Sequence, residues 1–127
     1  MRKDYNSQDQ NYRVIPYLSE RIAQFYDTDE RRGPAEYRRG LTKTPIEYLK
    51  MFYNDTAIYG NTSGLMCAYA FFGAEKLLFG TDTPFDNQLG ARVVRQTINA
   101  IEEMNITHLE KKKIFEDNAR KLLRLPT

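Results

Sequence analysis

The chain of 127 residues is 41% hydrophobic and 28% charged, and its formal net charge is +2. This length suffices for one domain with a core, and the near balance of charge argues against nucleic acid or an anionic membrane as a partner. No apolar run approaches the roughly 18 residues of a transmembrane helix, and the single cysteine, Cys67, excludes an intramolecular disulfide. These features predict a cytoplasmic protein.

Residues 1–13 are polar and show no hydrophobic periodicity, so we expect a flexible tail followed by one domain over residues 14–127. An amphipathic helix is predicted to begin near Pro16 and to end near Asp27. Its apolar residues recur at helical spacing: Val14, Leu18, Ile22 and Phe25.

A charged linker is predicted over residues 27–43. Its basic side chains are Arg31, Arg32, Arg38, Arg39 and Lys43. Such a run is typical of a solvated surface. The alternative is a site for an anion or a nucleic acid, which salt-sensitive binding would support.

A short helix and a strand are predicted after the linker. Thr44 and Glu47 have the spacing of a capping box, which begins a helix that ends near Met51. The strand covers residues 53–59. It contains Asp55, whose side chain could face the carboxyl-end mouth of the fold or bond to the nearby backbone, and which we interpret as a structural residue.

A second helix and strand follow. Thr62 or Ser63 can cap this helix, and Gly73 fits its end. Cys67 within the helix is interpreted as a small buried hydrophobe rather than a nucleophile. Residues 77–79 are apolar and predict a short buried strand.

The two strands with the helix between them form a β-α-β unit, which predicts parallel pairing. Gly80 ends the second strand, so Asp82 lies just past its carboxyl end, where ligands and catalytic groups collect in α/β folds. Asp82 also has a plainer interpretation as a cap of a turn, and Asp86 is interpreted as a turn or cap residue.

The remainder of the chain is predicted to be helical. A helix over residues 89–104 has its apolar side chains at Val94, Ile98 and Ile101. Thr107 and Glu110 form a second capping box. The only histidine, His108, is interpreted as a surface or helix-start residue.

The stretch Leu-Leu-Phe-Gly-Thr-Asp-Thr-Pro-Phe at 77–85 resembles the last barrel strand of the amidohydrolase-related family. The branch concerned includes aminocarboxymuconate-semialdehyde decarboxylase and the resorcylate-type decarboxylases. The similarity continues in the family's order over nearly the whole chain. Residues 15–22 resemble the segment after the sixth strand, residues 54–57 the seventh strand and residues 118–123 the closing helix.

This resemblance implies that Asp82 is the family's aspartate, which is a metal ligand and a proton-transfer group. The family's other ligands are histidines from earlier strands, and His108 lies where no family ligand belongs. A catalytic zinc normally has about three protein ligands. We therefore expect Asp82 to serve as a metal ligand and catalytic group only in a site completed elsewhere, with a divalent metal such as zinc, or with none in the lone chain.

A complete (β/α)8 barrel needs about 250 residues. The resemblance therefore implies an α/β fold that is part of such a barrel, with about two parallel strands and four to five helices. Unpaired strand edges predict completion by self-association into a homo-oligomer or by a complementary N-terminal barrel fragment.

Besides the anion or nucleic-acid site over residues 31–43, two functions remain open. The resemblance implies the C-terminal part of a metal-dependent hydrolase or decarboxylase that acts on small carboxylic acids. The alternative is a non-catalytic remnant that serves as an oligomerisation or interaction module. A partner-dependent activity that Asp82→Ala removes would favour the enzyme.

Overall fold

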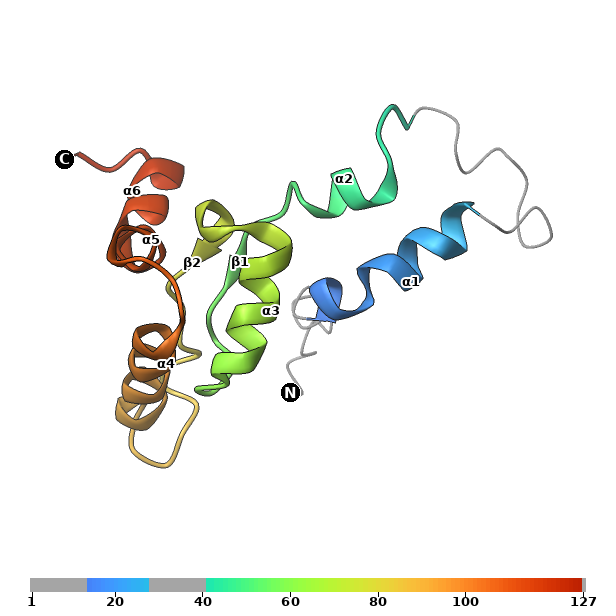
Figure 1. Ribbon diagram of the computed structural model, residues 1–127. Coiled ribbons are helices and arrows are strands. Elements are labelled where there is room, and N and C mark those ends of the chain that lie inside the picture. The colour runs from blue at the N-terminus through green and yellow to red at the C-terminus, as the bar shows by residue number, and fades with distance from the viewer. Residues whose placement is uncertain (1–13, 28–40, 127) are drawn as a thin grey trace, which may run out of the picture. The chain divides into compact units, whose positions relative to one another are not determined.

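The computed structural model describes residues 14–27 and 41–126, and residues 25–27 by their backbone alone. The chain divides into two compact units, Met1–Phe52 and Tyr53–Thr127 (Figure 1). The predicted tail over residues 1–13 and the predicted basic side chains at positions 31, 32, 38 and 39 lie outside the described residues. None of the helices within residues 14–27 and 41–126 combines the length and the apolar character that a membrane span requires.

The first unit begins with helix α1 (Ile15–Asp27), which confirms the predicted helix. Its buried side chains are four residues apart on one face of the helix: Ile15, Ser19 and Ala23. Val14 and Ile22 are 47% and 39% exposed. The buried stripe therefore lies one position along the chain from the predicted one.

Helix α2 (Pro45–Leu49) begins with the predicted capping box. The backbone nitrogen of Glu47 donates to Thr44 Oγ1 at 3.3 Å, and the Thr44 nitrogen donates to Glu47 Oε2 at 2.8 Å. Within this unit, α1 packs against α2. The helix ends two residues before the expected Met51, because the chain bends there through a turn in which the Met51 nitrogen bonds to the Tyr48 carbonyl.

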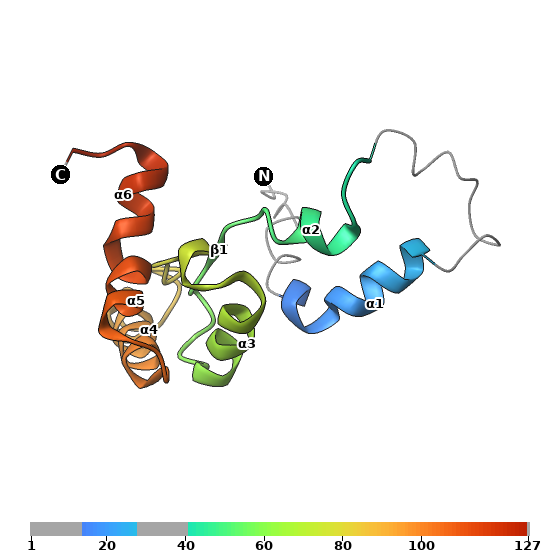
Figure 2. The ribbon, with the colours of Figure 1, turned by 45° about the horizontal axis from the view of Figure 1, so that its top comes forward.

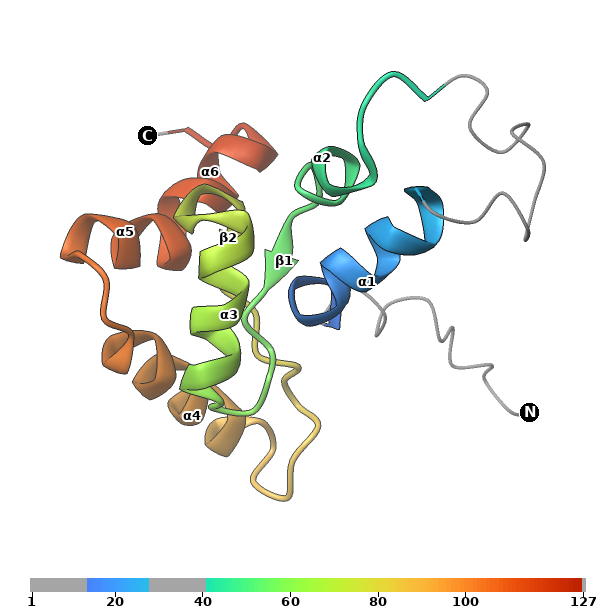
Figure 3. The ribbon, with the colours of Figure 1, turned by 45° about the vertical axis from the view of Figure 1, so that its right-hand side comes forward.

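The second unit contains a sheet of two parallel strands, β1 (Asn54–Asp55) and β2 (Leu77–Leu78). Asn54 pairs with Leu77, and Asp55 pairs with Leu78. Helix α3 (Thr62–Phe72) and a 3-10 turn (Ala74–Lys76) connect the strands, and Figure 3 shows α3 beside them. The predicted β-α-β unit with parallel strands is confirmed.

Both strands are shorter than predicted. The expected strand over residues 53–59 reduces to two residues, because local bonds replace the ladder beyond the Thr56 nitrogen. The Ala57 nitrogen donates to Asp55 Oδ1 at 2.9 Å, and the Ile58 nitrogen donates to the Thr56 carbonyl at 2.8 Å. The second strand also ends one residue early, since the Phe79 nitrogen bonds to the carbonyl of Ile114 in a helix instead.

Helix α3 has its cap one residue before the predicted positions. Asn61 Oδ1 accepts a hydrogen bond from the Gly64 nitrogen at 2.9 Å, while Gly73 ends the helix at φ 75° as expected. The buried face consists of Leu65, Ala68 and Phe72. Cys67 lies off this face and is exposed, so its interpretation as a buried hydrophobe is wrong.

Helix α4 (Ala91–Glu103) packs against α3. Its buried residues are Val93, Thr97, Ala100 and Ile101. Of the predicted apolar stripe, Ile101 is fully buried as expected, but Ile98 is 38% exposed and Val93 lies in the core instead of Val94. The helix begins later than expected, because Gly90 before it has a left-handed backbone with φ 92°.

The C-terminal helical run covers residues 108–123 (Figure 2). It consists of α5 (His108–Lys112), a π-helical turn (Lys113–Asp117) and α6 (Asn118–Leu123). A π-turn displaces the regular backbone bonding by one residue, and the carbonyl of Ile114 in this turn accepts the Phe79 nitrogen at 3.0 Å. The end of β2 is thereby joined to the helical run.

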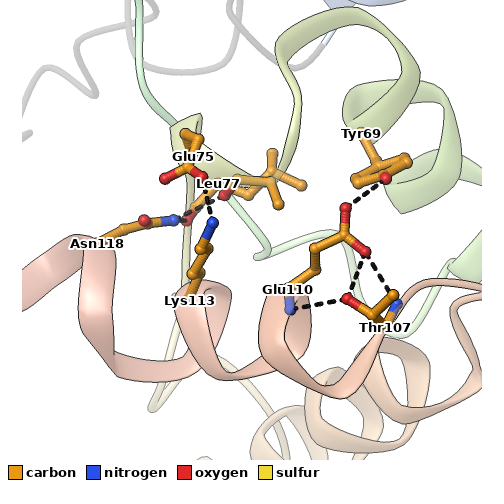
Figure 4. Close-up of polar contacts among 8 residues, drawn as sticks. Tyr69, Glu75, Leu77, Thr107, Glu110, Lys113 and Asn118 are labelled. Carbon is orange, nitrogen blue, oxygen red and sulfur yellow. Dashed lines mark hydrogen bonds and ion pairs between the residues drawn. The ribbon is translucent and has the colours of Figure 1, made fainter.

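Side-chain bonds of Asn118 and Glu110, beside an ion pair between Lys113 and Glu75, attach this helical run to the rest of the unit (Figure 4). Asn118 is buried, and its Nδ2 donates to the carbonyls of Ala74 and Leu77 at 2.7 and 2.8 Å. The predicted capping box of Thr107 and Glu110 is confirmed. Glu110 also accepts a hydrogen bond from the hydroxyl of Tyr69 in α3 at 2.7 Å. The core of this unit includes the fully buried Leu65, Leu77, Ile101 and Ile114.

Candidate functional site

The carboxyl ends of the two parallel strands lie at one edge of the sheet, since the strands run in the same direction. Asp55 is the last residue of β1, and Gly80 and Asp82 follow β2. Asp82 has a left-handed backbone conformation with φ 58°, which is uncommon for a residue other than glycine but more accessible to aspartate than to most. The structure thus places the predicted site residue on the loop directly beyond β2.

The first anchor of this loop is a pair of hydrogen bonds between Thr56 and Gly80. Thr56 Oγ1 donates to the Gly80 carbonyl at 2.9 Å and accepts from the Gly80 nitrogen at 3.0 Å. The Thr56 nitrogen also donates to the Leu78 carbonyl at 3.1 Å. Sequence reasoning missed Thr56, because its partner is 24 residues away and no local pattern indicates the pairing.

Gly80 approaches β1 closely at this anchor. A Cβ atom on Gly80 would lie 3.0 Å from the Cβ of Asp55, which is tighter than ordinary side-chain contacts. The Asp55 carboxylate accepts the Ala57 nitrogen at 2.9 Å. This bond agrees with the interpretation of Asp55 as a residue that bonds to the nearby backbone.

The loop itself is closed by local hydrogen bonds. The Phe85 nitrogen donates to the Asp82 carbonyl at 3.0 Å, and the Thr83 nitrogen donates to Thr81 Oγ1 at 3.2 Å. The peptide between Thr83 and Pro84 is cis. The side chain of Phe85 is 64% exposed, so this turn presents an aromatic ring to its surroundings.

Asp86 forms the second anchor of the loop. Its Oδ1 accepts the nitrogens of Gln88 and Gly90 at 2.6 and 2.9 Å, and its Oδ2 accepts the Val93 nitrogen at 2.9 Å. Loss of water around the carboxylate raises its pKa, but the backbone bonds from Val93, Gly90, Gln88 and Arg92 outweigh this and leave the pKa below its usual value. Asp86 is therefore a cap for the start of α4, as predicted.

The described residues do not make a metal centre by themselves. Within residues 14–27 and 41–126, no three His, Cys, Asp or Glu side chains are grouped so that they could hold a metal ion. His108 is exposed at the start of α5, in agreement with its interpretation as a helix-start residue. Asp82 brings one carboxylate, whereas a catalytic zinc takes about three protein ligands.

Comparisons with known proteins agree with this arrangement of strands and helices. A model of the amidohydrolase family matches residues 10–125. The dihydroxybenzoic acid decarboxylase of Polaromonas sp. JS666, solved with bound manganese and the inhibitor 2-nitroresorcinol, is 26% identical with a TM-score of 0.66. The match covers 88% of this chain and 31% of that one.

Two further solved structures are similar. The apo form of IDCase from Metarhizium anisopliae is 31% identical with a TM-score of 0.67, over 88% of this chain and 32% of that one. The 2,6-dihydroxybenzoate decarboxylase from Rhizobium is 25% identical with a TM-score of 0.64, over 87% and 32% of the two chains.

The chain thus spans about a third of the length of these solved relatives. A search of the curated proteins found no match. The family model covers almost the whole chain, and the predicted resemblance is confirmed. The chain belongs to the amidohydrolase family and is similar to the C-terminal portion of decarboxylases in that superfamily.

Proposed function

We propose that this chain supplies the last-strand part of the active site of a decarboxylase-like amidohydrolase that acts on small carboxylic acids. Two of the solved relatives are decarboxylases of dihydroxybenzoates, which favours decarboxylation of a hydroxylated aromatic acid over hydrolysis. The position of Asp82 beyond the carboxyl end of β2 supports this proposal most directly. Its carboxylate belongs to a loop that begins at the carboxyl end of β2 and is anchored on both sides.

Asp82 is proposed as a catalytic group and as one ligand of a divalent metal. A carboxylate oxygen suits manganese and zinc alike, and manganese is bound in the Polaromonas relative. The remaining ligands must come from residues outside the described part of the chain or from another chain. A carboxylate at this place can also hold or move a proton of the substrate.

The site is proposed to be completed by a second component. The solved relatives are about three times as long as the matched segment, and two strands cannot close a barrel. Leu89 and Leu109 are 90% and 73% exposed, which supports apolar contact with a homo-oligomeric copy or with a complementary N-terminal barrel fragment. Residues 14–127 would act as one domain in this assembly, in a cytoplasmic location.

The test compares manganese content with and without such a component. The chain is mixed with the N-terminal two thirds of the Polaromonas decarboxylase, and manganese per chain is measured after gel filtration. We expect metal uptake by the mixture and its loss with Asp82→Asn. Glu116→Gln is the matched control, because Glu116 is an exposed carboxylate that pairs with Lys112 at 2.8 Å on the C-terminal helical run.

The same experiment distinguishes the enzymatic function from the alternative, a non-catalytic interaction module. Manganese content that is the same for wild type and Asp82→Asn, or absent from a mixture that does form a complex, would overturn the enzymatic proposal. A complex without metal would then favour the non-catalytic interaction module. Conversion of 2,6-dihydroxybenzoate by the mixture, abolished by Asp82→Asn, would assign the reaction as decarboxylation.

A further inference from the structure

One hydroxyl group joins the two strands at the point where their backbone ladder ends. Thr56 is fully buried, and its Oγ1 donates to the carbonyl of Gly80 and accepts from the nitrogen of Gly80. A single side chain therefore satisfies both polar backbone groups of Gly80. Because only Thr81 separates Gly80 from Asp82, this pair fixes the backbone from which the Asp82 loop departs.

We propose that Thr56 is a positioning residue for Asp82, an inference that rests on the function proposed for that carboxylate. Thr56 reaches Asp82 through the backbone of Gly80 and Thr81. Its hydroxyl holds the start of the loop against β1, while Asp86 holds the other end against α4. With both ends fixed, the carboxylate is held at one place beyond the sheet edge.

The chemistry of the hydroxyl explains why threonine occupies this position. A hydroxyl donates one hydrogen bond and accepts others at the same time, which both bonds to Gly80 require. Valine has the same shape but can do neither, so it would leave the half-buried N–H and C=O of Gly80 without their hydrogen-bond partner. Serine retains the hydroxyl and loses only a methyl group.

A second buried threonine shows that a threonine hydroxyl can be buried in this unit without forming a hydrogen bond. Thr97 in α4 is also fully buried, yet its Oγ1 has no hydrogen-bond partner among the described residues. The two residues therefore form a matched pair within the second unit. Replacement by valine removes an anchoring hydroxyl at Thr56 and an unbonded one at Thr97.

The test uses hydrogen–deuterium exchange and carbon NMR of the full chain. Thr56→Val is expected to raise the exchange rate of the Gly80 amide about tenfold, with a rise that extends to Asp82, while the amides of α3 keep their rates. The carboxyl ¹³C resonance of Asp82 is expected to shift or broaden. Thr56→Ser and Thr97→Val are expected to leave both readouts near the wild-type values.

Several outcomes would overturn the inference. One is an unchanged Asp82 resonance and unchanged loop exchange in folded Thr56→Val. Another is a uniform rise of exchange over the whole unit, since a merely structural role predicts that pattern. If Thr56→Val does not fold, the exchange rates of Thr56→Cys and Thr56→Ser are compared instead. These variants differ only by sulfur in place of oxygen, and a thiol forms weak hydrogen bonds, so faster loop exchange is expected in Thr56→Cys alone.

The result of this experiment is independent of the result of the manganese experiment proposed above. Exchange and the Asp82 carbon resonance report on the loop whether or not manganese binds. Manganese uptake that Asp82→Asn leaves unchanged would overturn the role of Asp82 while the effect of Thr56 on the loop could still be seen. Normal manganese uptake with an unperturbed loop in Thr56→Val would overturn only the positioning role.

Discussion

The hydroxyl of Tyr69 donates a hydrogen bond of 2.7 Å to Oε1 of Glu110 and thereby joins α3 to α5 (Figure 4). The other carboxylate oxygen, Oε2, accepts the backbone nitrogen of Thr107 at 2.9 Å and its hydroxyl at 2.7 Å. These bonds, first from Tyr69 and then from Thr107, lower the pKa of Glu110 to about 2. The folded unit therefore favours the ionised form of this side chain.

The first prediction concerns acid stability. The pKa of Glu110 is about 2 in the folded chain against the ordinary value of 4.5, so its contribution is complete above about pH 4.5. It decreases as the pH falls from there towards 2. We expect Glu110→Gln, which resembles the protonated acid, to lower the melting temperature at pH 7 and to approach wild type near pH 2.

Circular dichroism melts between pH 2 and pH 7 provide this measurement. Glu116→Gln is the control, because Glu116 is an exposed carboxylate that pairs with Lys112 and its side chain is 47% exposed. A difference in melting temperature between wild type and Glu110→Gln that stays constant from pH 2 to pH 7 would contradict the prediction. It would show that the Tyr69 and Thr107 bonds do not depend on the charge of Glu110.

The second prediction concerns Asn118. Its amide donates to the carbonyls of Ala74 and Leu77 inside the unit, where it is 5% exposed. Asn118→Leu removes both donors and leaves two buried acceptors, so we expect a loss of about 2 kcal/mol or more in the free energy of unfolding. Urea titration followed by circular dichroism measures this loss.

An isosteric variant serves as the control for that prediction. Asn118→Asp keeps the shape but directs one carboxylate oxygen at the two carbonyl oxygens, so we expect a larger loss at pH 7 than for Asn118→Leu. The prediction fails if either variant unfolds at the wild-type urea concentration.

Local chemistry is the part of this fold that the sequence predicts well. The capping boxes at Thr44 and Thr107 and the cap formed by Asp86 depend on partners within seven residues, and all three are present. The parallel pairing of the strands also follows from one helix between two apolar segments. The three caps do not depend on the rest of the fold, because all their partners are local.

The buried face of each helix and the hydrogen-bond partners that are distant in sequence are predicted less well. In α4 the core contains Val93 where Val94 was expected, because a period of 3.6 residues does not select between adjacent apolar rows. The bond between Thr56 and Gly80 joins residues on different strands and depends on the register of the sheet. The position of Asp82 was predictable from its strand, whereas Thr56, which anchors the start of its loop, was not.

The third prediction concerns the buried hydroxyl of Thr97. This side chain is fully buried, and among the described residues its Oγ1 has no hydrogen-bond partner. Because burial of an unbonded hydroxyl costs about 1–3 kcal/mol, we expect Thr97→Val to stabilise the chain by about 1 kcal/mol. Thr97→Ala removes volume as well and is expected to destabilise. Equal loss of stability in both variants, measured by urea unfolding, would contradict the prediction.

The fourth prediction concerns Gly90, which ends the loop after β2. Its φ is 92°, and a Cβ atom there would lie 1.8 Å from Oγ1 of Thr83 and 3.2 Å from Cα of Pro84. Gly90→Ala therefore combines a strained backbone with a clash, and we expect it to cost about 2 kcal/mol or more. The exchange rates of loop amides should rise with it.

A double-mutant cycle separates these two costs. Thr83→Ala removes the oxygen nearest to the added Cβ, so the double variant Gly90→Ala with Thr83→Ala should recover part of the lost stability. The remainder measures the left-handed backbone and the approach to Pro84. Strictly additive effects would mean that Thr83 moves away without cost and that the backbone conformation alone requires glycine.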